Sequence, residues 1–215
     1  MTVKEAQRRL LTGMTPSMEG IGFDYDEQEF KRKIQGGSQR FYLRVTQRAN
    51  EIVVEPWWCI RLDGIVDIYH LVTLKKEEYF HYTCVFENNL GRLLYYLDQS
   101  QGPEIKDLKY VVRNIQDLET LIKVIPIRFK QYLLPYLDAN STIERADALL
   151  NEDPRNLSPH NWVYPYKATM GLIAARLVKN PRYYELVRIY EEELAEANPI
   201  NKEEFQKLKE LLEAY

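Results

Sequence analysis

The chain has 215 residues, enough to bury a substantial core in one domain of two lobes or in at most two small domains. Apolar residues make up 45% and charged residues 28%, a balance typical of a folded globular protein and not of a disordered one. The net charge of −3 argues against a protein that holds nucleic acid with its whole surface. Charge is unevenly spread, because segment 31–48 carries six basic side chains and no acidic one.

Cys59 and Cys84 are the only cysteines, too few for a disulfide framework, which favours a reducing compartment. The N-terminal segment lacks the long apolar stretch of a signal peptide. The most apolar helical segment, Met170–Val178, is far shorter than a bilayer span. These features predict a cytoplasmic protein that does not enter a membrane.

The first predicted element is a short amphipathic helix over residues 3–14, limited by Pro16 and Gly20. After it apolar residues mostly alternate, which predicts half-buried strands. Gly36-Gly37 supplies the turn of a hairpin, and Pro56 predicts that its strand lies at a sheet edge or bulges there. The expected strands open at Gly22-Phe23 and then cover Glu29–Ile34, Gln39–Arg48 and Ile52–Leu62.

Residues 65–72 have the length of a strand, yet the spacing of Val66, Tyr69 and Val72 favours a short helix. The next expected elements are a strand over Tyr79–Phe86, a short helix over Asn88–Gln99 and a last strand over Leu108–Arg113.

From about residue 115 apolar residues recur at spacings of three and four, which predicts amphipathic helices. The first should run over residues 116–137 and kink near Pro126. Ser141-Thr142-Ile143-Glu144 matches a capping box that starts a helix over Ser141–Glu152. After a loop over 153–164, helices are expected over 165–179, 181–197 and 201–214, separated by Asn180-Pro181 and Asn198-Pro199.

The order of these elements predicts an α+β protein. An antiparallel sheet of about five strands occupies a lobe over residues 1–114. A helical lobe over residues 115–215 packs mainly on one sheet face, and the two lobes are expected to share one core.

Strand alternation assigns one set of polar and aromatic side chains to the sheet face that points away from the core. Basic groups interleaved with aromatic rings can bind an anionic partner by charge, hydrogen bonding and stacking. The same alternation is also what the solvated face of any antiparallel sheet requires. This set, which we name the basic-aromatic face, is Lys31, Lys33, Arg40, Tyr42, Arg44, Arg48, Trp57 and Arg61.

Other residue patterns give weaker indications of a metal, catalytic or binding site. The histidines and cysteines lack the local spacing of most zinc sites and are read as core residues, so neither a metal nor a cofactor is predicted. Asp67 and His70 could orient an imidazole if they share a helix, but no nucleophile is placed beside them. The acidic cluster Asp24–Glu29 is read as a solvated turn. The aromatic segment 162–166 is either pinned onto the core or presented to a partner.

Gly22-Phe23, the basic strand ending in Phe41-Tyr42-Leu43-Arg44 and the Trp57-Trp58 strand followed by helices resemble small bacterial proteins filed as domains of unknown function. Such proteins have an N-terminal helix, a strand meander and a helical tail, and some are suspected toxin-immunity proteins. The resemblance covers about the first 115 residues and implies no catalytic residue.

The sequence therefore predicts a non-enzymatic protein-binding role, of the immunity, inhibitor or adaptor type, through the basic-aromatic face or the acidic C-terminal helices. One alternative is an enzyme or small-ligand carrier with a pocket between sheet and helices, lined by Trp58, Tyr82, His81 or His70. Another is a binder of single-stranded nucleic acid, whose affinity would fall steeply with salt.

Overall fold

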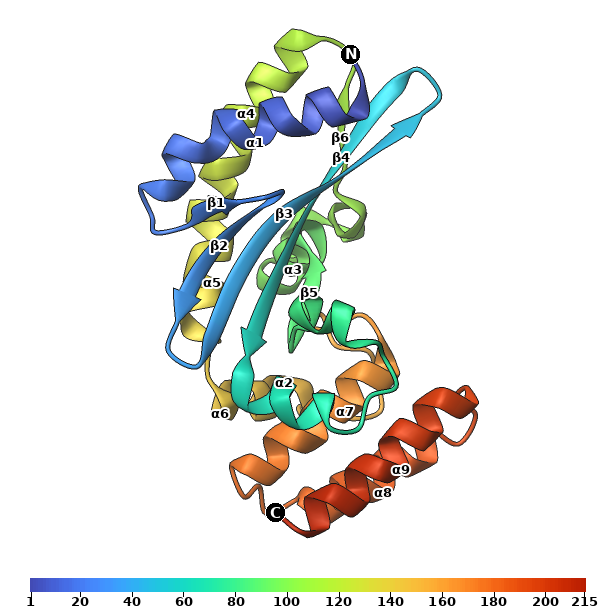
Figure 1. The fold of residues 1–215 in the computed structure, drawn as a ribbon. Coiled ribbons are helices and arrows are strands. Elements are labelled where there is room, and N and C mark those ends of the chain that lie inside the picture. Colours follow the sequence, from blue (N-terminus) through green and yellow to red (C-terminus); the bar gives the residue numbers. More distant parts are fainter. The chain divides into compact units, whose positions relative to one another are not determined.

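The computed structural model describes residues 1–215 and has the α+β architecture that the change of periodicity predicts (Figure 1). The strands belong to one open sheet in the order β1-β2-β3-β4-β5, and β6 also pairs with β4. The strands are β1 (Asp24–Asp26), β2 (Glu29–Ile34), β3 (Gly37–Arg48), β4 (Glu51–Leu62), β5 (Phe86–Asn89) and β6 (Tyr110–Val112).

The helices lie mainly in the C-terminal half of the chain. None of them is both long enough and apolar enough to cross a bilayer. The α-helices are α1 (Val3–Glu19), α2 (Asp63–His70), α3 (Leu90–Leu97), α4 (Ile115–Arg128), α5 (Leu134–Ala139), α6 (Ile143–Leu150), α7 (Tyr164–Leu177), α8 (Tyr183–Glu193) and α9 (Pro199–Glu213). The remaining helices are three 3-10 helices, η1 (Glu77–Tyr82), η2 (Gln99–Gln101) and η3 (Pro103–Asp107), and one π-helix, η4 (Phe129–Leu133).

The predicted hairpin is confirmed. β2 and β3 pair antiparallel from Glu29↔Tyr42 to Ile34↔Gly37. Gly36 in the turn has a φ of 71°, in the left-handed region that glycine enters without steric cost. Along β4 the side chains expected in the core are buried, as Val54, Trp58 and Ile60 illustrate. Val53, Trp57 and Cys59, which the same pattern assigns to the outer face, are buried as well. Alternation therefore located the core side of β4 but was wrong about its solvent side.

Several local predictions are wrong. Residues 79–86 are not a strand, because the chain forms η1 (Glu77–Tyr82) and reaches β5 only at Phe86. Of the residues that alternate there, Tyr82 is exposed whereas Cys84 and Phe86 are buried, so the alternation did not reflect one buried face. Helix α1 runs past Pro16 to Glu19 and ends at Gly20, so Pro16 lies inside the helix and does not terminate it. The capping residue of α6 is Thr142, whose side chain accepts from the Arg145 N–H, and not Ser141.

Two further expectations need correction. Of the two alternatives for Pro56, an edge strand or a bulge, the edge strand is wrong, since β4 pairs with β3 and also with β5 and β6. The β6 pairing covers Ile52–Val54 and ends before Pro56. Pairing with β6 therefore requires no backbone hydrogen bond from Pro56, which has no N–H to donate. Neither Cys59 nor Cys84 is a free thiol in the structure. Cysteine usage therefore does not favour a reducing compartment.

The chain divides into two compact units, each built from two segments. The first unit comprises Met1–Cys59 and Asn88–Ala139, and the second comprises Ile60–Glu87 and Asn140–Tyr215. This division differs from the lobes 1–114 and 115–215 that the sequence led us to expect, because segment 60–87 groups with the C-terminal helices and segment 115–139 with the strands.

The core of the first unit lies between the sheet and its helices. Helix α4 packs along α1, and the two lie side by side in Figure 1. The π turn η4 follows α4 and begins with Phe129. The Phe129 ring meets the rings of Phe23 and Phe41 edge to face, each at a centroid distance of 5.0 Å. These contacts join the segment before β1, strand β3 and η4 in one aromatic core.

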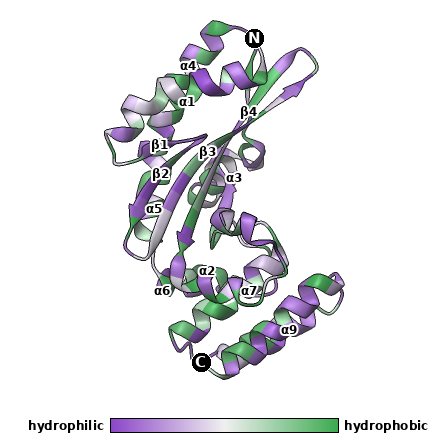
Figure 2. Ribbon diagram, in the orientation of Figure 1, coloured by the Kyte–Doolittle hydropathy of each residue, from purple (hydrophilic) through white to green (hydrophobic).

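The second unit is organised around α7, which contacts α2, α6, α8 and α9. Residues 167–175 of this helix are all buried, as expected for a helix surrounded by other helices. Gly171 lets α7 lie close to the C-terminal end of α6, because a Cβ added at this position would lie 2.6 Å from Asn151 Oδ1. Helix α9, which carries hydrophobic and hydrophilic segments along its length in Figure 2, packs on α7. Its buried side chains include Phe205 and Leu208.

Candidate binding site

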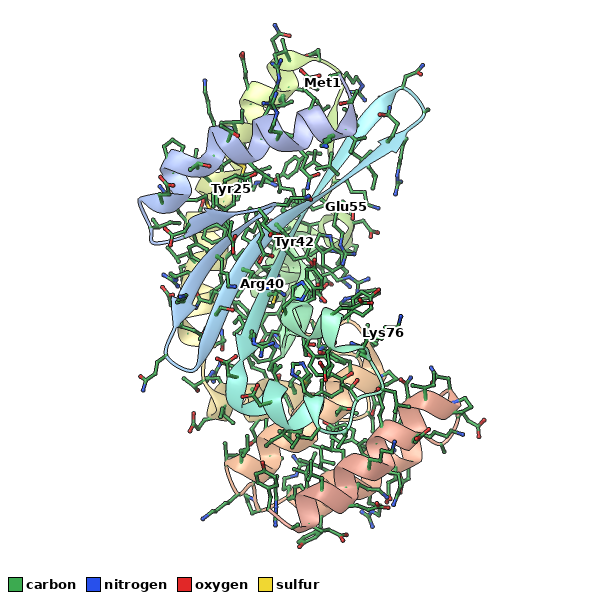
Figure 3. All side chains as sticks on the ribbon, in the orientation of Figure 1. Met1, Tyr25, Arg40, Tyr42, Glu55 and Lys76 are labelled. Atoms are coloured by element: carbon green, nitrogen blue, oxygen red, sulfur yellow. The ribbon has the colours of Figure 1, made fainter.

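The basic-aromatic face is only partly open to solvent. Arg40 and Trp57 are each 6% exposed and are buried, contrary to the expectation that they point freely into water. Tyr42, Lys31 and Arg61 are half-buried, and Arg44, Arg48 and Lys33 are exposed. Figure 3 shows Arg40 and Tyr42 on β3, with Glu55 on the adjacent β4.

The side chains of this face pack on one another. The rings of Tyr42 and Trp57 stack at a centroid distance of 6.4 Å. The Arg44 guanidinium lies 3.4 Å from the centre of the Trp57 ring, a close cation–π contact. Arg40 lies opposite Lys31 in the hairpin and forms an ion pair with Glu29 at 3.5 Å. Burial raises the pKa of the Glu29 carboxyl, and the charge of Arg40 opposes that shift.

Arg61 belongs to the second unit and has a local role there. It forms an ion pair with Asp63 at 2.7 Å and donates to the Phe80 carbonyl oxygen at 3.0 Å. Asp67 lies 3.6 Å from the same guanidinium, and His70 stacks on the Phe80 ring at 3.8 Å. Helix α2 is confirmed, but it uses Asp67 to pair with Arg61 and His70 to pack against an aromatic ring.

A pocket of about 620 Å³ lies entirely within the second unit. Sequence reasoning placed a pocket between sheet and helices and named Trp58, Tyr82, His81 and His70 as its lining, of which only Tyr82 lines this one. We name it the tyrosine pocket. Its aromatic walls are Tyr69, Tyr79, Tyr82, Trp162 and Tyr166, and its polar side chains are Lys75, Thr83, Glu87, Thr169, Asn201 and Glu204.

The inner wall of the tyrosine pocket consists of two aromatic rings in contact. Tyr69 at the end of α2 meets Tyr166 in the first turn of α7 edge to face, at a centroid distance of 5.2 Å and an angle of 86°. Burial raises the pKa of Tyr69 to about 12 and raises the pKa of Tyr166 well above 10. Both phenols therefore stay neutral at physiological pH, and their rings offer uncharged aromatic faces.

The charged groups of the pocket are a buried carboxylate and a lysine. Glu204, on α9, is 8% exposed, and its Oε1 accepts from the Thr73 hydroxyl at 2.8 Å and the Leu74 N–H at 2.6 Å. The Lys75 ammonium lies 4.6 Å from the centre of the Tyr166 ring and 5.5 Å from that of Tyr69. Burial lowers the pKa of Lys75, and the carboxylates of Glu204 and Glu87 partly offset this effect.

The mouth of the pocket gathers large apolar side chains that remain exposed. Tyr79 is 52% exposed and Ile200 is 57% exposed. The set, which we name the rim, is Leu74, Tyr79, Tyr82, Trp162, Val163 and Ile200. The rim comes from three separate segments, so the fold assembles one apolar patch from residues that are scattered in the sequence.

The aromatic segment 162–166 is both pinned and presented. The Tyr164 hydroxyl donates to the Pro154 carbonyl oxygen at 2.5 Å, and Tyr166 forms the pocket wall. Trp162 is 43% exposed on the rim. Of the two alternatives left open by the sequence, each therefore applies to part of the segment.

No group of three histidine, cysteine or acidic side chains is placed to hold a metal ion. No protein-family model matches the chain, and neither a curated protein nor a solved structure matches it. The function is therefore inferred from the geometry of the chain itself.

Proposed function

We propose that this chain is a non-enzymatic binding protein and that a protein partner docks on the rim of the tyrosine pocket. The observation that carries this proposal is the clustering of exposed apolar side chains around one concave site. A contiguous exposed apolar patch is costly in water and commonly marks a surface that another molecule covers. Tyrosine and tryptophan, which the rim and walls share, are also the residues that dominate the binding energy of protein interfaces.

The exposure of the rim favours a protein partner over a small ligand. A small-molecule site normally encloses most of its ligand and keeps its apolar residues inside the cavity. Here Tyr79 and Ile200 keep more than half of their surface in water, at 52% and 57%. A partner that covers them must extend beyond the cavity itself, as a protein surface or peptide segment does.

The polar groups of the pocket support binding and orientation. Glu204 is held in place by Thr73 and the Leu74 backbone, so its carboxylate has one fixed direction. The tyrosines remain protonated, because burial raises the pKa of Tyr69 and Tyr166. Fixed hydrogen-bond acceptors among aromatic walls select a binding partner by geometry and charge.

Selection of displayed peptides on the purified full chain tests this proposal. Peptides that bind the wild-type protein should bind the variants Tyr79→Ser and Ile200→Ser about tenfold more weakly, the effect of losing about 1.4 kcal/mol of contact energy. The matched control is Tyr184→Ser, because Tyr184 is 76% exposed in the same unit but does not line the pocket. Equal weakening by the control, or none by either rim variant, would reject the rim as the docking site.

The basic-aromatic face is a second candidate surface for a protein partner. It is favoured by the stack of Tyr42, Trp57 and Arg44, beside which Arg48 and Lys33 are exposed. An acidic partner would meet the exposed guanidinium groups, and its affinity would fall as salt screens them. We rank this face second because Arg40 and Trp57 are buried.

A further inference from the structure

We propose that the tyrosine pocket receives a lysine side chain of the protein partner, and that Lys75 of this chain occupies the same place when the partner is absent. This inference rests on the proposed docking function and names the chemistry of the group that docks. It follows from three features of the pocket, namely its two inner rings, its buried carboxylate and the way in which Lys75 is held.

The two inner rings form a corner that suits a cation. Tyr69 and Tyr166 stand nearly perpendicular, at 86°, and each turns toward the Lys75 ammonium. The distances of 5.5 Å and 4.6 Å from Nζ to the ring centres lie within the range of cation–π attraction. An ammonium group therefore already occupies this corner, which shows that the space and the aromatic faces accommodate it.

The carboxylates that line the pocket partly offset the cost of burying an ammonium group there. Glu87 and Glu204 contribute two carboxylates, against the single ammonium of Lys75. Glu204 is 8% exposed, and its hydrogen bonds from Thr73 and Leu74 both reach Oε1. A buried carboxylate gains stability from a nearby positive charge, since little water remains to solvate it.

Lys75 is held loosely enough to be displaced. Its ammonium forms no ion pair or hydrogen bond, and it interacts with the rings and, at longer range, with the carboxylates. It stands in the exposed segment between α2 and η1, so its side chain can turn into water without moving a helix. A partner lysine that replaces it adds the burial of the rim, which Lys75 alone leaves exposed.

The experiment uses the full chain and two capped tripeptides, acetyl-Leu-Lys-Leu-amide and the same peptide with an Nε-acetylated lysine. Binding is followed by NMR titration. The charged peptide should bind about tenfold more tightly than the neutral one, since only the former offers a cation to the rings and carboxylates. Glu204→Gln should weaken the charged peptide about tenfold, because glutamine keeps the acceptor oxygen for Thr73 and Leu74 but lacks the charge.

Lys75→Met tests the role of the internal lysine. This variant keeps an apolar stem and removes the competing ammonium, so the charged peptide should bind at least about threefold more tightly. Lys76→Met is the matched control, because Lys76 follows Lys75 in sequence, points into solvent and does not line the pocket (Figure 3). It should leave the affinity for both peptides unchanged.

The outcomes separate this inference from the proposed function. If both peptides bind equally and the rim variants weaken both, the docking site stands and the lysine inference is overturned. If neither peptide responds to the rim variants, the docking site itself is rejected. Tighter binding of an arginine peptide than of the lysine peptide would also overturn the assignment of lysine. A melting temperature of Glu204→Gln equal to wild type excludes misfolding as the cause of its weaker binding.

Discussion

Two aromatic clusters of this molecule, one in each unit, differ in how far their own side chains cover them. On the sheet of the first unit, Trp57 is 6% exposed and the Arg44 guanidinium lies 3.4 Å over its ring. At the tyrosine pocket of the second unit, Tyr79 is 52% exposed and Ile200 is 57% exposed. In the sheet cluster, folding has already removed the aromatic surface from water. At the rim, the apolar surface remains in water, and only a partner that covers it would gain the free energy of its burial.

The difference shows why an alternating pattern alone is a poor guide to a binding surface. Alternation states on which side of a strand a residue lies, and this was correct for the core residues of β4. It does not state what packs against that side. A surface is available to a partner only where apolar side chains remain uncovered, and this property emerges from the assembled fold.

Removal of the Trp57 ring offers the largest test of this comparison. Because Trp57 is buried and stacked with Tyr42 and Arg44, Trp57→Ala should lower the free energy of unfolding by about 4 kcal/mol. Urea denaturation followed by circular dichroism measures this loss. A loss below about 1 kcal/mol would mean that the ring is accessible, and the sheet face would then replace the rim as the favoured docking surface.

Buried His160, in the second unit, should make the free energy of unfolding depend on pH. The expected change is slightly smaller than that for Trp57→Ala. Burial, aided by the charges of Arg145 and Lys167, lowers the pKa of this imidazole from 6.5 to about 4. The unfolded chain thus binds a proton at pH 5 that the folded chain does not, so stability falls as pH drops from 6.5 towards 4. The shift corresponds to a loss of up to about 3 kcal/mol.

The variant His160→Gln isolates this contribution. The difference in unfolding free energy between pH 7 and pH 4.5 should be smaller in the variant than in wild type, because glutamine does not titrate. Urea denaturation at the two pH values measures it. An identical loss of unfolding free energy in both proteins would mean that groups other than His160 cause the acid sensitivity.

Much of the fold could be predicted from the chain. The hairpin followed from Gly36-Gly37 and the alternation around it, and the start of α9 followed from Asn198-Pro199, because each of these signals acts within a few residues. The strand predicted over segment 79–86 is wrong, since Phe80, Tyr82 and Cys84 alternate with polar residues as in a strand, yet the chain there forms η1. Periodicity over so few residues does not distinguish a strand from a short helix with exposed aromatic side chains.

The tyrosine pocket could not have been found in this way. Its walls come from α2, η1, α7 and α9, which belong to two distant parts of the chain. Thr73 and Glu204, for example, share a hydrogen bond although they lie 131 positions apart in sequence. Tyr166 belongs to the aromatic segment 162–166, but no sequence pattern near it indicates its contact with Tyr69 or its place beside Glu204 in the pocket. The one available signal was the unusual number of tyrosines, 16 in 215 residues, which indicates surplus aromatic surface without locating it.

The exposed arginines of the sheet permit a finer test. Arg44→Leu removes the guanidinium over Trp57 and should cost about 1 kcal/mol of stability, the usual size of such a contact near the surface. Arg48→Leu, in the same strand and exposed, should change stability by less than about 0.5 kcal/mol. Equal losses in both variants would mean that the contact with Trp57 contributes nothing specific, and that Arg44 is free to serve a partner.

The smallest expected effect on stability is at the rim, and it is the most direct test of the comparison. Because Tyr79 is 52% exposed, Tyr79→Ser should change the free energy of unfolding by less than about 0.5 kcal/mol while it weakens the selected peptides. The two measurements must diverge, since an interface residue stabilises the complex and not the free protein. A loss of stability above about 1.5 kcal/mol would indicate that Tyr79 anchors η1, and its exposure would then no longer indicate a surface kept open for a partner.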